Sequence, residues 1–324
     1  MGRAYRLFFL TVQKASPYNF SIMSEQRLLH RLGFFYLQLI GFFGHILPRG
    51  LMFFLAFLIG NLYWAIMARD RRMVQKNLTQ ILGDPGRARR TARRTFIHYA
   101  KYLVDYTRMD LLHEENYFQI VHRFEGQRHI DQALAKGKGA LILTGHLGNW
   151  EMGGVFLILR GYSLMVITAP DFEVRLHRYR VRLRQGHRIK VVTLNDTLAS
   201  SLSILKALKD NELVALLGDR DLLGKGVPVD FFGKRVYFPM GPSLLASLSG
   251  APLIPTFVIM DEKDQYVCLA EAPLELQKTE DREADLAVNT QRIAHLMEKH
   301  IRAHPEQWFT FYDFFERHRV RENP

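Results

Sequence analysis

The chain has 324 residues, of which 48% are hydrophobic and 23% are charged, and this composition excludes an intrinsically disordered protein. A single cysteine excludes a disulfide framework and any metal site built from several cysteines. Lys and Arg outnumber Asp and Glu by 44 to 32, and the net charge of +12 predicts a polyanionic partner, which could be nucleic acid, an anionic membrane surface or a phosphorylated substrate.

The first apolar feature of the chain is a pair of runs without formal charge, residues 32–48 and 50–68, separated only by Arg49. Each run approaches the roughly 20 apolar residues that cross a bilayer. Pro48 should break the helix between them. Buried core helices of a soluble protein are the alternative, although two such helices in tandem are unusual there. We therefore predict an apolar helical membrane anchor over residues 1–68.

A basic helical connector is predicted next, over residues 69–116. Residues 69–101 carry ten Lys and Arg against Asp70 and Asp84. Positive charge on both sides of the anchor favours a hairpin, or helices that dip into one leaflet, with both ends in the cytoplasm. The basic helix is either a solvated face or a surface that attracts anionic headgroups.

The remaining segment, residues 117–324, alternates short apolar runs of strand type with helical stretches, which predicts an α/β sheet with covering helices. The predicted strands are Phe118–Phe124, Ala140–Thr144, Ser163–Ile167, Lys190–Val192, Leu213–Leu217, Leu253–Met260 and Tyr266–Leu269. The predicted helices are Ile130–Ala135, Trp150–Arg160, Glu173–Arg184, Leu198–Lys209, Pro242–Leu248 and Asp285–Ala303. Sites in such sheets lie at the carboxyl ends of strands, so chemistry is expected directly after residues 144, 168 and 217.

The string TGHLGNWE follows the strand that ends at residue 144 and precedes an apolar helix. A histidine on such a loop, His146, is well placed as a general base. Glu151 would lie about 140° from it on a common helix, so the two converge only if His146 is on the loop and Glu151 is in the first helical turn. Glu151 is then expected to orient His146. The bare spacing arises about once by chance in a chain of this composition, so the prediction depends on the whole string in its strand–loop–helix context.

This string resembles the signature of the bacterial lipid A late acyltransferases, the lauroyl and myristoyl transferases within the H-x4-[DE] glycerolipid acyltransferases. The resemblance extends over most of the chain, to RRMVQKNL, LLGDRD, VPVDFFGKRVYFPMGPSLLASLSGAPLIPTFV and the C-terminal PEQWFTFYDFF. The family often continues Trp-x-His-x-Arg after that last tryptophan. Here Trp308 is followed by Phe-Thr-Phe, and this departure leaves the acceptor open.

The resemblance implies a mixed central sheet flanked by helices and a membrane-associated O-acyltransferase. Its donor would be an acyl carrier protein thioester, and its acceptor a hydroxyl of a phosphorylated glycolipid, foremost a lipid A precursor. Other lipid acceptors (a phosphatidylinositol mannoside, a lysophospholipid or an ornithine lipid) and a lipid hydrolase are the alternatives. Nucleic acid is not expected as a partner, because no nucleic-acid-binding motif is present. The resemblance also implies the bacterial inner membrane, with the catalytic domain facing the cytoplasm, and neither cofactor nor metal.

The remaining site residues are expected in two later segments. In the Arg-rich helix after residue 173, Arg184 is favoured over Arg182 as the group that supports the oxyanion or a substrate phosphate. By similarity Asp219 pairs with that helix or binds acceptor hydroxyls, although an ion pair that merely holds the loop is the alternative. The helix start at Trp150 is expected to offer amides to the oxyanion. The predicted substrate-binding residues are Gly148, Asn149, Trp150, Arg220 and Asp221.

Overall fold

The central element of the fold is a seven-stranded mixed sheet with the strand order β1-β9-β8-β2-β5-β3-β4. The structure is a computed structural model that describes residues 23–170, 173–194, 198–222 and 224–320, with the backbone alone for residues 23–34. Strands β2, β3, β4, β5 and β8 are mutually parallel, β9 is antiparallel to β8, and β1 is parallel to β9. The strand bounds are Val121–Glu125 (β1), Ala140–Thr144 (β2), Leu164–Thr168 (β3), Lys190–Thr193 (β4), Leu213–Leu217 (β5), Leu253–Met260 (β8) and Tyr266–Ala270 (β9).

The sheet separates two hydrophobic cores, because successive side chains of a strand point to opposite faces. Leu141 and Leu143 of β2 pack with α9 (Leu198–Lys209), α10 (Gly241–Ser249) and α11 (Arg282–Ala303). Ala140 and Ile142 pack with α5 (Pro85–Thr107), α6 (Gln127–Leu134) and α7 (Trp150–Leu159). Burial on both faces explains why these strands are continuous apolar runs. The other helices of this part are α8 (Val174–Gly186) and α12 (Phe314–Arg317). Every strand and helix predicted after residue 117 is present, with ends within three residues of the predicted bounds.

The N-terminal part consists of α2 (Met23–Ile46), α3 (Arg49–Ile66), α4 (Ala68–Leu82) and α5 (Pro85–Thr107). The predicted break at Pro48 is confirmed, since α2 ends at Ile46 and α3 begins at Arg49. A turn separates α4 from α5. Gly83 closes α4 in the left-handed region, and Asp84 caps α5 by accepting hydrogen bonds from the next turn.

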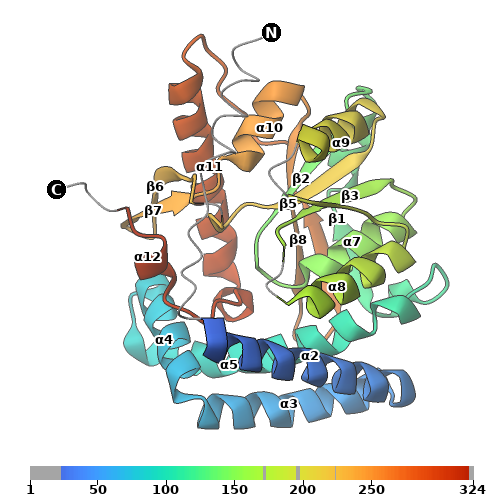
Figure 1. The fold of residues 1–324 in the computed structure, drawn as a ribbon, viewed down its shortest axis with the longest axis vertical. Coiled ribbons are helices and arrows are strands. Elements are labelled where there is room, and N and C mark those ends of the chain that lie inside the picture. Colours follow the sequence, from blue (N-terminus) through green and yellow to red (C-terminus); the bar gives the residue numbers. More distant parts are fainter. Residues whose placement is uncertain (1–22, 171–172, 195–197, 223, 321–324) are drawn as a thin grey trace.

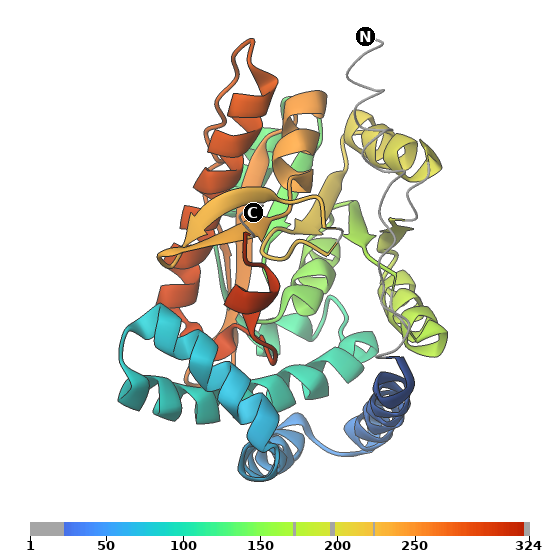
Figure 2. The same cartoon turned by 60° about the vertical axis from the view of Figure 1, so that its left-hand side comes forward.

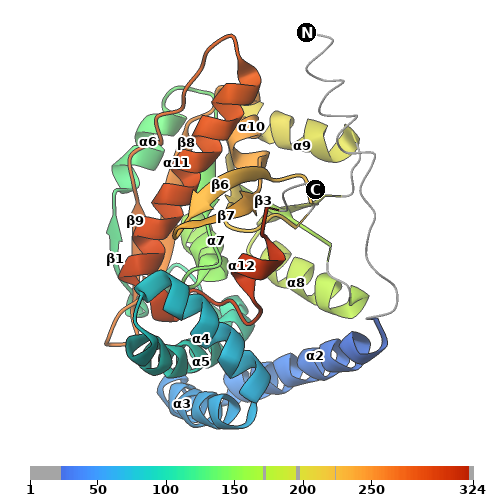
Figure 3. The ribbon, with the colours of Figure 1, turned by 90° about the vertical axis from the view of Figure 1, so that its left-hand side faces the viewer.

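Helix α3 lies lengthwise against α5 and does not project from the molecule (Figures 1 and 3). One face of α3, with Met52, Phe53, Ala56 and Gly60, is buried. A side chain at Gly60 would come within 2.8 Å of the backbone of Ile97, so glycine permits this close helix contact. Among the described residues α3 is the one helix long and apolar enough to cross a membrane. Its outward side chains are exposed and apolar: Leu51, Phe54, Phe57, Leu58, Ile59, Leu62 and Ile66.

A β-hairpin formed by β6 (Val227–Phe231) and β7 (Lys234–Phe238) is present where no strands were predicted. Phe232 and Gly233 at its tip both have positive φ, the geometry of a tight two-residue hairpin turn. Val229 and Val236 on its inner face are buried in the core that includes α11. Figure 2 shows the gold hairpin beside the orange-red α11, where it covers one side of the sheet.

Candidate active site

Two neighbouring strand ends bring His146 and Asp219 together. Strands β2 and β5 pair in register up to Thr144 opposite Leu217, so the loops after them leave the sheet side by side. The Asp219 carboxylate accepts a hydrogen bond from the His146 ring, with Nδ1 to Oδ1 at 2.8 Å, and a second one from the His146 backbone N–H at 3.1 Å. Two of the three segments in which chemistry was expected, those directly after residues 144 and 217, are therefore neighbours in the structure.

Two further side chains hold the Asp219 carboxylate, which is fully buried. The indole N–H of Trp308 donates to Oδ2 at 3.2 Å, and Nε of Arg220 lies 3.7 Å from the same oxygen. Arg220 also donates to the backbone carbonyl of Phe309 and to the hydroxyl of Thr310. Asp219 is therefore fixed from three directions and cannot turn away from the ring.

This environment sets the protonation of the His146–Asp219 pair. Burial, and next the charge of Arg220, lower the pKa of His146 against the opposing effect of Asp219. Burial alone would raise the pKa of Asp219, but the His146 ring and Arg220 outweigh it, so the pKa of Asp219 is lowered. At neutral pH the ring is thus neutral and the carboxylate ionised. Since Nδ1 carries the proton given to Asp219, Nε2 is left with a lone pair that can accept a proton.

The carboxylate that contacts His146 differs from the one expected. Glu151 is in the first turn of α7, as predicted, but its carboxylate forms a bidentate ion pair with Arg184, at 2.6 Å and 3.0 Å. Both groups are buried. Burial would raise the pKa of Glu151, and the charge and hydrogen bonds of Arg184 lower it instead. The prediction that Glu151 orients His146 is therefore wrong. Asp219 orients the ring, because strand register places it there, and Glu151 fixes α8 against α7.

The site residues predicted in the Arg-rich helix and after β5 do not all lie near His146. Arg184 is buried against Glu151, whereas Arg182 is exposed on the outer side of α8, where it lines an open pocket with Arg175 and Arg178. Asp221 accepts hydrogen bonds from the backbone amides of Lys225 and Gly226 and so shapes the loop after β5. Asp219, Arg220 and Arg184 therefore gather around the catalytic loop, and Arg182 and Asp221 do not contact His146.

The loop itself is held by its backbone. Gly148 has φ +66°, and a side chain there would overlap the carbonyl oxygen of Val258, so this position requires glycine. Asn149 caps α7 by accepting a hydrogen bond from the amide of Met152 at 3.2 Å. The Trp150 ring lies edge-on to His146, with ring centroids 5.0 Å apart.

A wall of aromatic rings leads from His146 to an apolar cavity. Trp150 stacks on Tyr102 of α5, and Tyr102 stacks on Tyr99. Tyr99 lines a cavity of about 420 Å³ between α2, α3 and α5, together with Phe96 and other apolar side chains. A series of ring contacts thus connects the catalytic loop to this cavity.

Trp308 and Thr310 were not predicted as site residues. Both residues belong to the C-terminal PEQWFTFYDFF string, which shows the resemblance to the family but gives no sign of a contact with Asp219. In the described part of the chain no three His, Cys, Asp or Glu side chains are grouped so that they could hold a metal ion.

The fold and the site define an α/β protein with a neutral histidine on the loop directly after the central strand of a mixed sheet, oriented by a buried aspartate. A family model for bacterial lipid A biosynthesis acyltransferases matches residues 21–317. The chain therefore belongs to this family and is an enzyme that transfers acyl groups.

Similar curated proteins carry a narrower name. The phosphatidylinositol mannoside acyltransferase of Mycobacterium tuberculosis, strain H37Rv, is 29% identical over 257 residues, which cover 78% of this chain and 79% of that protein. The protein of the same name from Mycolicibacterium smegmatis is 31% identical over 182 residues, which cover 56% of this chain and 58% of that protein.

Proposed function

We propose that the protein transfers an acyl chain from a thioester donor to a sugar hydroxyl of a phosphorylated glycolipid at a bacterial inner membrane, with its catalytic part on the cytoplasmic side. The observation that carries this proposal is the pairing of His146 Nδ1 with Asp219, which leaves Nε2 of a neutral ring as the proton acceptor. A lipid hydroxyl with its pKa far above neutrality needs such a base to become a nucleophile.

The reaction follows from these atoms. His146 Nε2 takes the proton of the acceptor hydroxyl as its oxygen bonds to the thioester carbonyl carbon. Asp219 stabilises the imidazolium that forms. The tetrahedral intermediate then breaks its C–S bond, and the imidazolium returns the proton to the leaving sulfur. No acyl-enzyme is needed, since the acceptor attacks the donor directly.

Arg220 is the group we place beside the oxyanion of that intermediate. Its Nε is buried and makes no hydrogen bond within the described residues, although it lies next to Asp219. A fixed cation in a buried site is well suited to a developing negative charge. The backbone amides of the first turn of α7, from Trp150 on, are the second source of donors.

The apolar surroundings of the site favour a lipid substrate. The cavity between α2, α3 and α5 is lined by side chains such as Phe96, Tyr99 and Leu103, and we place the acyl chain in it. The exposed apolar side of α3 and the basic residues of α4 and α5 favour a membrane surface with anionic headgroups.

The acceptor class has two named forms. A lipid A precursor is favoured by the family model, and a phosphatidylinositol mannoside by the names of the similar mycobacterial proteins. Both present sugar hydroxyls on a phosphate-bearing lipid. We propose acyl carrier protein as the donor, because an acidic carrier suits the net charge of +12, with coenzyme A as the alternative carrier.

The test uses the full-length protein in phospholipid vesicles with acyl carrier protein thioester or acyl coenzyme A. Each donor is combined with a lipid A precursor or a phosphatidylinositol mannoside, and products are identified by mass spectrometry. We expect one acceptor to gain a single acyl chain, and His146→Ala to form no product. Release of free fatty acid without acylation of either acceptor would contradict acyl transfer and favour a hydrolase.

A further inference from the structure

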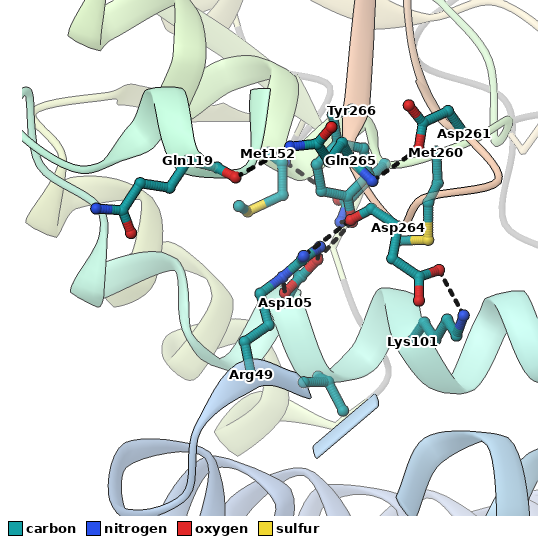
Figure 4. Close-up of polar contacts among 12 residues, drawn as sticks. Arg49, Lys101, Asp105, Gln119, Met152, Met260, Asp261, Asp264, Gln265 and Tyr266 are labelled. Atoms are coloured by element: carbon teal, nitrogen blue, oxygen red, sulfur yellow. Dashed lines mark hydrogen bonds and ion pairs between the residues drawn. The ribbon is translucent and has the colours of Figure 1, made fainter. Parts of the chain in front are cut away.

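A network of polar contacts runs inward from Arg49, the partly exposed charged residue that separates the two apolar runs. Its guanidinium forms a bidentate pair with Asp105 of α5, with Nε to Oδ1 at 2.9 Å and Nη2 to Oδ2 at 2.8 Å. Its Nη1 donates to the backbone carbonyl of Asp264, in the turn between β8 and β9, at 2.8 Å. Figure 4 shows Arg49 reaching from α3 between α5 and this turn.

Tyr266, the first residue of β9, connects Asp105 to the catalytic loop. Its hydroxyl donates to Asp105 Oδ2 at 2.8 Å and accepts a hydrogen bond from the side-chain amide of Asn149 at 2.8 Å. Asp105, Tyr266 and Asn149 are each at most 2% exposed. A satisfied network of buried side chains holds its members in one arrangement, because any rotation leaves a buried polar group unpaired.

Asn149 is the point where this network meets the catalytic loop. Its amide oxygen caps α7 at Met152, so the side chain is held at both ends. Its backbone N–H donates to the carbonyl of Val258 at 2.8 Å. The next residue is Trp150, which lies against His146, and the one after it is Glu151. A displacement of Asn149 would therefore move the ring that faces the base.

We propose that Arg49, Asp105 and Tyr266 are positioning residues for the His146 loop, and that they make acyl transfer depend on the seating of α3 against α5. The inference rests on the proposed acyl transfer. A bilayer that contacts both the exposed apolar face of α3 and the exposed basic residues of α5, where Arg93 of α5 donates to Asn61 of α3, favours the seated arrangement over one in which α3 has lifted from α5, because only the seated arrangement presents both surfaces together. The hydrogen bonds from Arg49 through Asp105 and Tyr266 then couple the position of α3 to that of Asn149.

A network that only joined α5 to the β8–β9 turn would not need to reach Asn149. The ion pair between Lys101 and Asp264 already joins α5 to the β8–β9 turn, and its side chains are partly exposed. The chain through Tyr266 instead runs inward and ends on the cap of the catalytic helix. Lys101 thus supplies a matched control, since it joins α5 to the β8–β9 turn without contacting Asn149.

The test compares Tyr266→Phe with Lys101→Met in vesicles that contain anionic phospholipid. Tyr266→Phe removes one oxygen and keeps the ring that packs on Phe156. We expect it to lower kcat about tenfold or more, with KM within about threefold of the unchanged protein, whereas Lys101→Met leaves both within about twofold. An unchanged kcat in Tyr266→Phe, or an equal loss in Lys101→Met, would overturn the inference.

A double-mutant cycle tests whether the residues act as one chain. Arg49→Lys keeps the charge but loses the bidentate geometry with Asp105. If both residues act through Asn149, the double variant Arg49→Lys, Tyr266→Phe should lose little more than the larger single loss. Losses that multiply would show independent effects and contradict a common path.

Hydrogen exchange gives a readout that needs no substrate. On addition of vesicles, we expect slower amide exchange in α3 and in residues 146–152 for the unchanged protein and for Lys101→Met. In Tyr266→Phe, α3 should still become protected while residues 146–152 do not. Equal protection of this loop in Tyr266→Phe would contradict the positioning role. If residues 146–152 become protected on addition of vesicles but the protein transfers no acyl group, only the proposed function would be contradicted.

Discussion

Two buried carboxylates flank the catalytic loop, and they do different things. Asp219, at the end of β5, contacts a neutral imidazole and receives its Nδ1 proton in a hydrogen bond. Glu151, in the first turn of α7, contacts the permanent cation of Arg184 in a bidentate pair. The first arrangement orients a base, whereas the second neutralises a buried charge and joins two helices. Residue type and closeness in sequence do not distinguish these roles, but the partner atom does.

The largest expected effect is on the Asp219 side of this comparison. Asp219→Asn would place an amide on Nδ1, which can donate to the ring and leave the proton on Nε2. Since the base is then in the wrong tautomer, we expect kcat to fall by about 10²–10⁴. The loss should not exceed that of His146→Ala measured beside it, and circular dichroism checks that the fold is kept. A variant with more than a tenth of the normal rate would show that Asp219 does not orient the base.

Loss of the Glu151 carboxylate should lower the stability of the fold before it affects the base. Glu151→Gln leaves the Arg184 guanidinium buried without its anion, which costs about 3–5 kcal/mol of the free energy of unfolding. The matched double variant Glu151→Gln, Arg184→Met removes both charges and should recover much of that loss in denaturant titrations. If Glu151→Gln unfolds at the same denaturant concentration as the unchanged protein, the Glu151–Arg184 pair does not stabilise the packing of α8 against α7.

A region that touches neither carboxylate sharpens the comparison. Phe54 and Leu58 lie one turn apart on the exposed side of α3. Replacing both by Asp puts charge where we place the lipid surface, and loss of their apolar contact should weaken vesicle binding about tenfold or more. The melting temperature should change little, because neither side chain is buried. Unchanged cosedimentation with anionic vesicles would contradict a membrane role for this face.

The smallest expected effect is a shift in pH dependence. Burial and then Arg220 lower the pKa of His146, so the neutral base persists below its ordinary titration range and activity falls only at acidic pH. Arg220→Met removes a positive charge, raises the pKa of His146, and should move this acid limb of the kcat/KM profile to higher pH. Arg220→Lys keeps the charge and should keep the limb in place. A limb that moves equally in both variants would assign the shift to packing instead of charge.

Much of the fold could be predicted from the sequence because its signals are local. Continuous apolar runs predicted the buried strands, and Pro48 predicted the end of a helix. Strand ends after residues 144 and 217 also predicted where the site lies. The hairpin over residues 227–238 was missed, since its turn at Phe232 is not one of the usual Asn-Gly or Asp-Gly pairs.

The partner of His146 could not be predicted, because it depends on register between strands distant in sequence. Glu151 is five residues from His146 and drew the prediction, whereas Asp219 is 73 residues away. Only the pairing of Thr144 with Leu217 brings Asp219 to the ring. The same reason applies to Trp308, which reaches Asp219 from the C-terminal segment, and to Tyr266, which reaches Asn149 from β9.

The central claim is that Asp219 holds His146 as a neutral base with its proton on Nδ1. Nitrogen NMR of the full-length protein labelled at histidine, with His146 assigned by comparison with His146→Ala, measures this directly. At neutral pH we expect a protonated Nδ1 and an unprotonated Nε2 for His146, unchanged in Glu151→Gln and lost in Asp219→Asn. A proton on Nε2 in the unchanged protein, or a tautomer that follows Glu151 instead of Asp219, would contradict this claim.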